Sequence, residues 1–207
     1  MTEKEQAIAA SRLARRTATI QAIKKTRTQV DFWSQDLLRS ANESWERRAA
    51  SAATFIPPGS RVLDIGCGDM KMERNLPEGC SYLPMDVSAR DERTIVVDLN
   101  RQRLPKVAAD FVVALGLLEY IFDVPKLLRQ IARQIPQGLF SYHPLEKTPG
   151  RDRLAMNWVN ALNSPEIIAL FKQAGYRQIT VHEYAPTLHF YHVSTQRAQR
   201  ADPSDAG

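Results

Sequence analysis

The chain has 207 residues, a formal net charge of +5 and 25% charged residues, which suits one globular domain with an extension. No apolar run reaches the roughly 18 residues of a membrane-spanning helix, so we expect no membrane span. The two cysteines, Cys67 and Cys80, are too few for a disulfide framework and lack paired metal-ligand spacing. We therefore expect a reduced, cytoplasmic protein without a bound metal.

The excess positive charge lies in the N-terminal part of the chain. Residues 1–57 hold ten bases against six acids, whereas the rest of the chain holds eighteen bases against seventeen acids. A strong basic field would favour nucleic acid as a partner. Because the excess is confined to the first segment, nucleic acid is not the favoured partner, although that segment leaves it open.

Residues 3–55 contain no Gly and no Pro and are rich in Ala, Arg, Lys, Gln and Glu, which predicts helix. The stretch from Thr26 to Asp31 marks a break into two helices. The second carries a broad apolar face: Phe32, Trp33, Leu37, Leu38, Ala41 and Trp45. This face either packs on the following domain, which we favour, or forms a lid over a substrate site. For the first helix, solvent exposure, an oligomer contact and an anionic-surface contact stay open.

After Pro57-Pro58-Gly59, short apolar runs alternate with helical segments, which predicts a mostly parallel sheet covered on both faces. The expected strands are 61–65, 81–85, 94–97, 110–115, 138–142 and a final hairpin of 177–184 and 188–194. The expected helices are 69–76, one capped by Asp123, and one from Ser164, acting as its cap, to Gly175.

Between Asp86 and Thr94 the chain is too short for a crossover helix, so a turn or loop is expected. The polar residues 197–207 are expected to form a disordered tail. The predicted organisation is thus a helical extension over 1–57, an α/β domain over 58–196 and this tail.

The segment Asp64-Ile65-Gly66-Cys67-Gly68-Asp69 spans the end of the first expected strand and the turn after it. Glycines lack a Cβ, so the backbone of this turn can approach a ligand closely, and the amides near Asp69 can donate hydrogen bonds. Acids also end the next two strands, at Asp86 and Asp98. Since ligands of open parallel sheets bind beyond the carboxyl ends of the strands, these groups predict one shared site, with Asp86 suited to the hydroxyls of a ribose.

These motifs closely resemble those of the class I S-adenosylmethionine-dependent methyltransferases. The resemblance implies an α/β fold with a mostly parallel, Rossmann-like sheet of seven strands and a C-terminal antiparallel hairpin strand, preceded by the N-terminal helices. It also implies S-adenosyl-L-methionine as the cofactor, and a cofactor-binding set made of Asp64, Gly66, Cys67, Gly68, Asp69, Asp86, Val87, Asp98, Leu99, Leu115 and Gly116.

The resemblance gives parts of this set individual roles. Asp64 would orient the cofactor ammonium, Asp86 would accept from the ribose, and Asp98 with Leu99 would hold the adenine. Gly116 would leave room for the methyl donor. Two departures stand out: Met70 replaces a frequent glycine or small residue, and the short link after Asp86 removes part of the usual wall around the adenosine.

Methyl transfer from a sulfonium is an in-line displacement, so the protein mainly aligns the reactants and excludes water. His143, just past the fifth expected strand, is the candidate base, and a locally hydrogen-bonded loop histidine is the alternative. Candidate substrate contacts are Tyr142, Arg151, Asn157 and Trp158, with core packing and solvated loop as alternatives.

We expect a methyltransferase acting on oxygen or nitrogen of a small-molecule acceptor. An RNA methyltransferase and a non-catalytic methyltransferase-like binding module are the alternatives. A nicotinamide oxidoreductase is less favoured, because Gly66-x-Gly68 lacks the third glycine of the dinucleotide fingerprint. The sequence does not indicate the acceptor or the oligomeric state.

Overall fold

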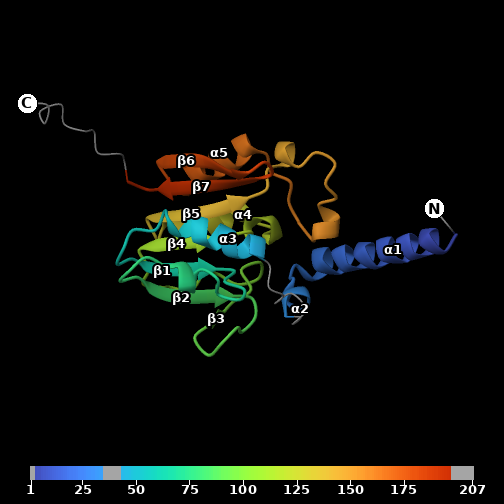
Figure 1. The fold of residues 1–207 in the computed structure, drawn as a ribbon, viewed down its shortest axis with the longest axis horizontal. Helices are drawn as coiled ribbons and strands as arrows, with labels where there is room; N and C mark the ends of the chain where they lie inside the picture. The colour runs from blue at the N-terminus through green and yellow to red at the C-terminus, as the bar shows by residue number, and fades with distance from the viewer. Residues whose placement is uncertain (1–2, 35–42, 197–207) are drawn as a thin grey trace, which may run out of the picture.

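The computed structural model describes residues 3–34 and 43–196. Within these ranges, seven strands form one sheet in the order β3-β2-β1-β4-β5-β7-β6 (Figure 1). The strands are β1 (Arg61–Ile65), β2 (Ser81–Asp86), β3 (Ile95–Val96), β4 (Phe111–Ala114), β5 (Gln137–Tyr142), β6 (Gln178–Ala185) and β7 (Leu188–Ser194). The first five run parallel, whereas β7 is antiparallel to both β5 and β6. The predicted sheet with its C-terminal hairpin is confirmed.

Helices cover both faces of this sheet. The described α-helices are α1 (Glu3–Thr26), α2 (Val30–Trp33), α3 (Glu43–Ala53), α4 (Val124–Ala132) and α5 (Ser164–Ala174). Short 3₁₀ turns lie at η2 (Glu73–Asn75), η3 (Leu118–Tyr120), η4 (Leu145–Lys147) and η5 (Leu154–Met156). Helix α3 lies over one face, and α4 packs with α5 on the other (Figure 1).

Strand β4 shows why the sheet is buried on both sides. Phe111 and Val113 belong to the apolar cluster under α3, whereas Val112 and Ala114 belong to the cluster under α4 and α5. Successive strand residues point to opposite faces, so an unbroken apolar run supplies both cores. The order of connections reverses between β1 and β4, which places a crevice at the carboxyl ends of these two strands.

The N-terminal helices separate where the sequence predicts. Helix α1 ends at Thr26, Arg27 takes a φ of +51°, and α2 begins at Val30. Helix α1 extends away from the sheet (Figure 1), with Ile20 and Ile23 buried near its end. Of the predicted apolar face, Leu37, Leu38 and Ala41 lie outside the described residues, as does the predicted tail. The boundary at residue 57 stays a prediction.

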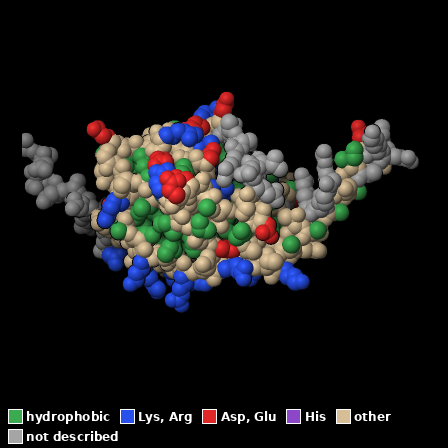
Figure 2. All heavy atoms as spheres, turned by 90° about the horizontal axis from the view of Figure 1, so that it is seen from below, with side chains coloured by type: hydrophobic (Ala, Val, Ile, Leu, Met, Phe, Trp, Pro, Cys, Tyr) green, Lys and Arg blue, Asp and Glu red, His purple; other side chains and the backbone are tan. Residues whose placement is uncertain are grey.

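The surface in the described ranges carries charges of both signs. Figure 2 shows Lys and Arg along one rim of a face that also bears acidic side chains and hydrophobic ones. No helix in residues 3–34 or 43–196 combines the length and apolarity needed to cross a bilayer.

Two helix starts obey capping rules, one of them with a different residue from the predicted one. Asp123 caps α4 by accepting from the Lys126 amide at 3.0 Å, as expected. Helix α5 begins at Ser164, but Asn163 provides the cap: its Oδ1 accepts from the Glu166 amide, and the Glu166 carboxylate accepts from the Asn163 amide. These two hydrogen bonds between Asn163 and Glu166 satisfy two backbone amides at the start of the helix. The Ser164 hydroxyl caps neither of them.

The helix predicted over 69–76 is absent. The chain instead makes a turn from Cys67 to Met70 and then the 3₁₀ turn η2. Met70 adopts a φ of +57°, outside the helical region, at the position where the resembled family often has glycine. The loop predicted between Asp86 and Thr94 is present, with turns and bends in place of a helix.

Replacing Met70 by glycine is expected to raise the free energy of unfolding by about 1 kcal/mol. A left-handed backbone costs a residue with a Cβ roughly 1–2 kcal/mol, and the greater freedom of glycine in the unfolded chain cancels part of the gain. Urea unfolding measures the change. At a different position with a positive φ, +75°, the opposite kind of change is Gly79→Ala. It adds a Cβ to a left-handed residue and should lower the free energy of unfolding by a similar amount. A Met70→Gly variant no more stable than the native chain would contradict the strained turn.

Candidate active site

A cavity of about 250 Å³ lies at the carboxyl ends of β1, β2 and β4. It is lined by all eleven residues predicted to bind the cofactor, from Asp64 to Gly116, together with His143 and Trp158. The parallel topology brings these residues together, because they lie at or just beyond the carboxyl ends of strands that finish at the same edge of the sheet.

The glycine turn after β1 is shaped to leave space in this cavity. Gly66 and Gly68 have φ values of +79° and +52°. A Cβ built on Gly68 would meet nothing within 4 Å, whereas one on Gly66 would lie 3.3 Å from Leu117. The Gly68 amide donates to Oδ2 of Asp86 at 2.9 Å, so the acid at the end of β2 fixes the turn after β1.

Asp86 has one acceptor position left. Its Oδ2 accepts from the Gly68 amide, and its Oδ1 accepts from the Ser88 amide at 3.2 Å and from Arg90 at 3.0 Å. A carboxylate offers about four lone-pair sites, so roughly one, on Oδ2, remains for a ligand. Arg90 also donates to the backbone oxygen of Trp33 at 3.1 Å, which connects this acid to α2.

Asp64 is buried beside this turn, and burial raises its pKa to about 7. The Tyr82 hydroxyl donates to its Oδ2 at 2.7 Å and opposes the rise, while the nearby charge of Asp86 adds to it. Near neutral pH a cationic ligand group would therefore favour the ionised form of Asp64.

The raised pKa of Asp64 predicts a pH-dependent effect of Asp64→Asn. The unfolded carboxyl ionises near pH 4, and the folded one near pH 7, so its contribution to stability is full below about pH 4 and is lost as the pH rises to 7. The asparagine variant should match the native chain at pH 4 and exceed it at pH 8, by at most about 4 kcal/mol.

Urea midpoints at both pH values measure this effect of Asp64→Asn. Asp110 provides a control of opposite sign, because its hydrogen bonds with Arg61 hold its pKa at about 2, so Asp110→Asn should lower stability at pH 8. If Asp64→Asn destabilised the protein equally at both pH values, the raised pKa of Asp64 would be contradicted.

Asp98 presents an unsatisfied oxygen in the same cavity. Its Oδ1 accepts from the Asn100 amide at 3.0 Å, while Oδ2 is buried with no hydrogen-bond partner among the described residues. The Asn100 side chain donates to the Tyr120 carbonyl and accepts from the Phe122 amide, both at 2.9 Å, which anchors this loop. A buried acceptor without a partner fits an amino group of a ligand.

Glu119 and His143 lie together at the other end of the cavity. The His143 amide donates to Oε1 of Glu119 at 2.9 Å, and Oε2 of Glu119 is buried without a described partner. Burial raises the pKa of Glu119. Glu119 thus holds the loop after β5 and lines the cavity, a role that the sequence did not predict.

The His143 ring has a defined tautomer. Its Nδ1 lies 2.6 Å from the Thr187 carbonyl oxygen, which accepts and does not donate, so Nδ1 carries the hydrogen. Burial lowers the pKa of His143 to about 4, and its ring stacks on Trp158 with centroids 4.9 Å apart. The imidazole is therefore neutral at pH 7, with Nε2 as its hydrogen-bond acceptor.

The other three predicted substrate contacts do not line the cavity. Tyr142 is buried, and its hydroxyl donates to Asn160 and accepts from Arg153 and the Leu162 amide. Arg151 is exposed, with its guanidinium 5.8 Å from the Trp158 ring centre. Asn157 is buried, and its backbone carbonyl accepts from the Gln29 side-chain amide at 3.3 Å.

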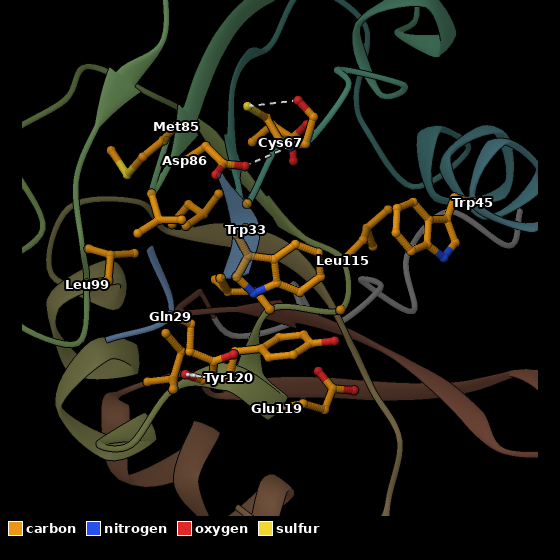
Figure 3. A pocket seen from close by; sticks show the side chains of 18 of the residues that line it. Gln29, Trp33, Trp45, Cys67, Met85, Asp86, Leu99, Leu115, Glu119 and Tyr120 are labelled. Atoms are coloured by element: carbon orange, nitrogen blue, oxygen red, sulfur yellow. Dashed lines mark hydrogen bonds between the residues drawn. The ribbon is translucent and has the colours of Figure 1, made fainter. Parts of the chain in front are cut away.

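Helix α2 borders the cavity, a placement that sequence reasoning offered as the lid alternative. The Trp33 ring meets Tyr120 edge to face at 4.9 Å, and the Ser34 hydroxyl bonds with that of Ser88 at 2.8 Å. Figure 3 shows Gln29 and Trp33 on this side, next to Tyr120. Trp45 and Arg48 of α3 also line the cavity. Trp45 belongs to the predicted apolar face, whereas no sequence motif marks Arg48.

A model of the methyltransferase domain family matches residues 37–181 of the chain. No curated protein matches it by sequence. Among solved structures, a possible histamine N-methyltransferase from Thermotoga maritima aligns with a TM-score of 0.54 and 10% identity, over 73% of this chain and 89% of that one. A methyltransferase from Mesorhizobium loti aligns with a TM-score of 0.55 and 16% identity, over 70% and 95%.

A phosphoethanolamine N-methyltransferase from Haemonchus contortus, in complex with phosphomonomethylethanolamine and S-adenosylhomocysteine, is also similar. It has a TM-score of 0.60 and 16% identity, over 73% of this chain and 53% of that one. At these identities the structural matches show the fold, while the family model covers most of the described chain. The chain therefore belongs to the methyltransferase domain family and is a class I S-adenosylmethionine-dependent methyltransferase.

Proposed function

We propose that the chain transfers the methyl group of S-adenosylmethionine to oxygen or nitrogen of a small molecule. The observation that carries the proposal is one cavity that joins the glycine turn and strand-end acids to Glu119, His143 and Trp158. When bound, the cofactor supplies an electrophilic methyl on a sulfonium. The residues of this chain then bind both reactants, align them and exclude water.

The cavity residues fit this cofactor. Space is open above Gly68, an acceptor position remains on Asp86, and Oδ2 of Asp98 has no described partner. We assign the ammonium to Asp64, a ribose hydroxyl to Asp86 and the adenine amine to Asp98. The remaining contacts are assigned to Gly66, Cys67, Gly68, Asp69, Val87, Leu99, Leu115 and Gly116.

At the acceptor end, we assign to His143 the contact with the proton on the hydroxyl or amine that attacks the methyl group. Its neutral Nε2 can accept a hydrogen bond from a hydroxyl or amine and so orient it. A pKa of about 4 makes it a weak base, so this contribution is mainly alignment until the proton becomes acidic in the transition state. Trp158 supplies an apolar wall beside it.

The size of the cavity and the position of α2 favour a small acceptor over RNA. The face shown in Figure 2 bears acidic side chains as well as its rim of Lys and Arg, so it is not uniformly basic. The possible histamine N-methyltransferase of Thermotoga maritima and the phosphoethanolamine N-methyltransferase of Haemonchus contortus are both named for small amines, which supports a small acceptor here.

Methyl-tritiated S-adenosylmethionine tests this proposal. The protein is incubated with a low-mass metabolite extract or with total RNA, and radioactivity is measured in each fraction. We expect label in a low-mass product other than the cofactor, and none in RNA. Label in RNA would replace the proposal with the RNA alternative, and cofactor binding without any label would favour the non-catalytic module.

A further inference from the structure

Six exposed bases gather on one surface of the domain when the chain folds: Arg101, Arg103, Lys106, Lys126, Arg129 and Arg133. The first three lie in the loop between β3 and β4, and the other three lie on α4 or directly after it, spaced by three and four residues and thus on one face. The Leu104 amide donates to Oε1 of Gln130 at 2.7 Å, which fastens the loop to α4. The Val107 amide donates in the same way to Gln134 at 3.3 Å. We call these six bases the basic surface.

Among the described residues, the side chains of the basic surface have no ion-pair or hydrogen-bond partner. Other exposed arginines differ in this respect. Arg61 pairs with Asp110 at 2.8 Å, and Arg74 pairs with Glu46. The cations of the basic surface therefore keep their donors free for a partner outside the chain.

The acids of the same stretch do not neutralise this surface. Residues 98–136 hold six bases against four acids. Asp98 and Glu119 line the cavity, and Asp110 pairs with Arg61. Asp123 caps α4 and is the exposed one of the four without a described ion pair. The near-neutral charge of the domain as a whole thus conceals a local excess of positive charge, which arises because the fold brings α4 and the loop together.

The basic surface continues to the end of α1. Lys24 and Lys25 lie exposed in the last turn of this helix. The guanidinium carbon of Arg27 lies 4.4 Å from the centre of the Phe122 ring, next to the residue that caps α4. Figure 2 shows a row of Lys and Arg along one rim of the molecule, running toward α1. The cations therefore form an extended strip, which suits an extended anionic partner better than one small anion.

Apolar side chains lie beside these bases at the β3 edge of the sheet. Val96 is 53% exposed, and Ile95, Pro105 and Val107 are partly exposed. Loops without a helix join β2 to β3 and β3 to β4, so neither connection covers this edge. Figure 2, which views the molecule from the β3 side, shows hydrophobic side chains inside the rim of Lys and Arg.

We propose that the basic surface docks the protein on a lipid bilayer that contains anionic phospholipids. Each Lys or Arg close to such a bilayer strengthens binding about fivefold, and apolar side chains beside the cations can enter the headgroup region. Asn100 precedes the first base of the loop, and Gln29 follows Arg27 closely; both line the cavity. Docking therefore places the cavity beside the bilayer, whatever the methyl acceptor is.

Nucleic acid is the competing partner for a strip of cations, since its phosphates attract the same side chains. Proteins that hold single-stranded nucleic acid also stack bases on aromatic rings. In the described part of this surface, the Phe122 ring is half-buried and Arg27 covers it, so no ring is left for a base. Apolar side chains next to the cations favour the bilayer, because a hydrated phosphate backbone gains nothing from them.

Sedimentation with vesicles tests the proposal on the full chain. One set of vesicles is phosphatidylcholine alone, and the other is an equal mixture of phosphatidylcholine and phosphatidylglycerol. Arg129→Gln with Arg133→Gln removes two charges from the basic surface. Lys172→Gln with Arg177→Gln is the matched control, because these two exposed bases lie on α5 and just before β6, the strand at the opposite edge of the sheet from β3. Gln is close to Lys and Arg in helix propensity, so both variants should melt near the native temperature.

We expect the native chain to bind the mixed vesicles, to ignore phosphatidylcholine and to be released at about 1 M salt, where charges are screened beyond roughly 3 Å. The double variant on α4 should bind about 25-fold more weakly, at about fivefold per charge, and the control should stay within about twofold of native. If the α4 variant does not fold, Arg101→Gln with Arg103→Gln in the loop should show the same loss.

Three results would overturn the proposal: equal binding of the native chain to both kinds of vesicle, no binding to either, or equal losses in the α4 variant and the control. Fluorescence anisotropy with duplex RNA provides the other comparison. A loss of RNA affinity in the α4 variant with unchanged vesicle binding would assign the basic surface to nucleic acid. Failure of the proposed function appears separately, as absent methyl transfer by the native protein, and the α4 variant should transfer methyl groups at the native rate in solution without vesicles.

Discussion

Asp86→Ala is expected to weaken S-adenosylhomocysteine binding about 100-fold while the protein stays folded. A hydrogen bond to a charged group contributes about 1.5–3 kcal/mol, which corresponds to roughly 10-fold to 150-fold in affinity. The substitution removes the acceptor assigned to the ribose. It also frees the Gly68 amide and leaves Arg90, whose side chain is 10% exposed, without its carboxylate. Calorimetry measures the affinity.

Two comparisons separate these effects. Asp110→Ala removes an exposed acid that pairs with Arg61 and does not line the cavity, so it should leave the affinity within twofold of native. An analogue without one ribose hydroxyl should lose less affinity than S-adenosylhomocysteine when Asp86 is replaced. Equal losses for both ligands would assign the effect to the Gly68 turn, and unchanged affinity in a folded variant would remove Asp86 from the ribose site.

Gly138→Ala is expected to lower the free energy of unfolding by about 3 kcal/mol, near the upper end for overpacking. A Cβ at this position would lie 2.3 Å from Cγ1 of Val112 and 2.7 Å from its backbone oxygen. Val112 pairs with Gly138 in the parallel ladder, and its strand also pairs with β1, so the backbone cannot move aside without breaking bonds on both sides. The melting temperature should fall by about 10 °C.

Two variants check the cause of this destabilisation. Gly150→Ala places a Cβ with nothing within 4 Å, at a φ of +73°, so it should cost about 1 kcal/mol through backbone strain alone. Adding Val112→Ala to Gly138→Ala removes the side-chain clash but not the one with the backbone oxygen, so any rescue should be partial. A Gly138→Ala protein with native stability would mean that β4 and β5 are not spaced as described.

The strands were predictable because their signals are local. Apolar runs bounded by Gly, Pro and acids give β1 and β7 their full lengths, and the short link after Asp86 excludes a helix by length alone. The helix over 69–76 failed for a tertiary reason. Asp86 holds the Gly68 amide and Cys67 accepts from the Met70 amide, so this stretch is fixed by a residue of the next strand against its own helical preference.

In the candidate site, too, some residues could be predicted from the sequence and others depend on tertiary contacts. By itself, the sequence determined the strand-end residues, from Asp64 to Gly116, because parallel strands bring their carboxyl ends to one edge whatever the details of packing. Tertiary structure alone decided that Tyr142 is satisfied by its neighbours and that Glu119 holds the loop of His143. It also placed Arg48 over Gly116, a contact between distant segments that depends on how α3 packs on the sheet and leaves no pattern in the sequence.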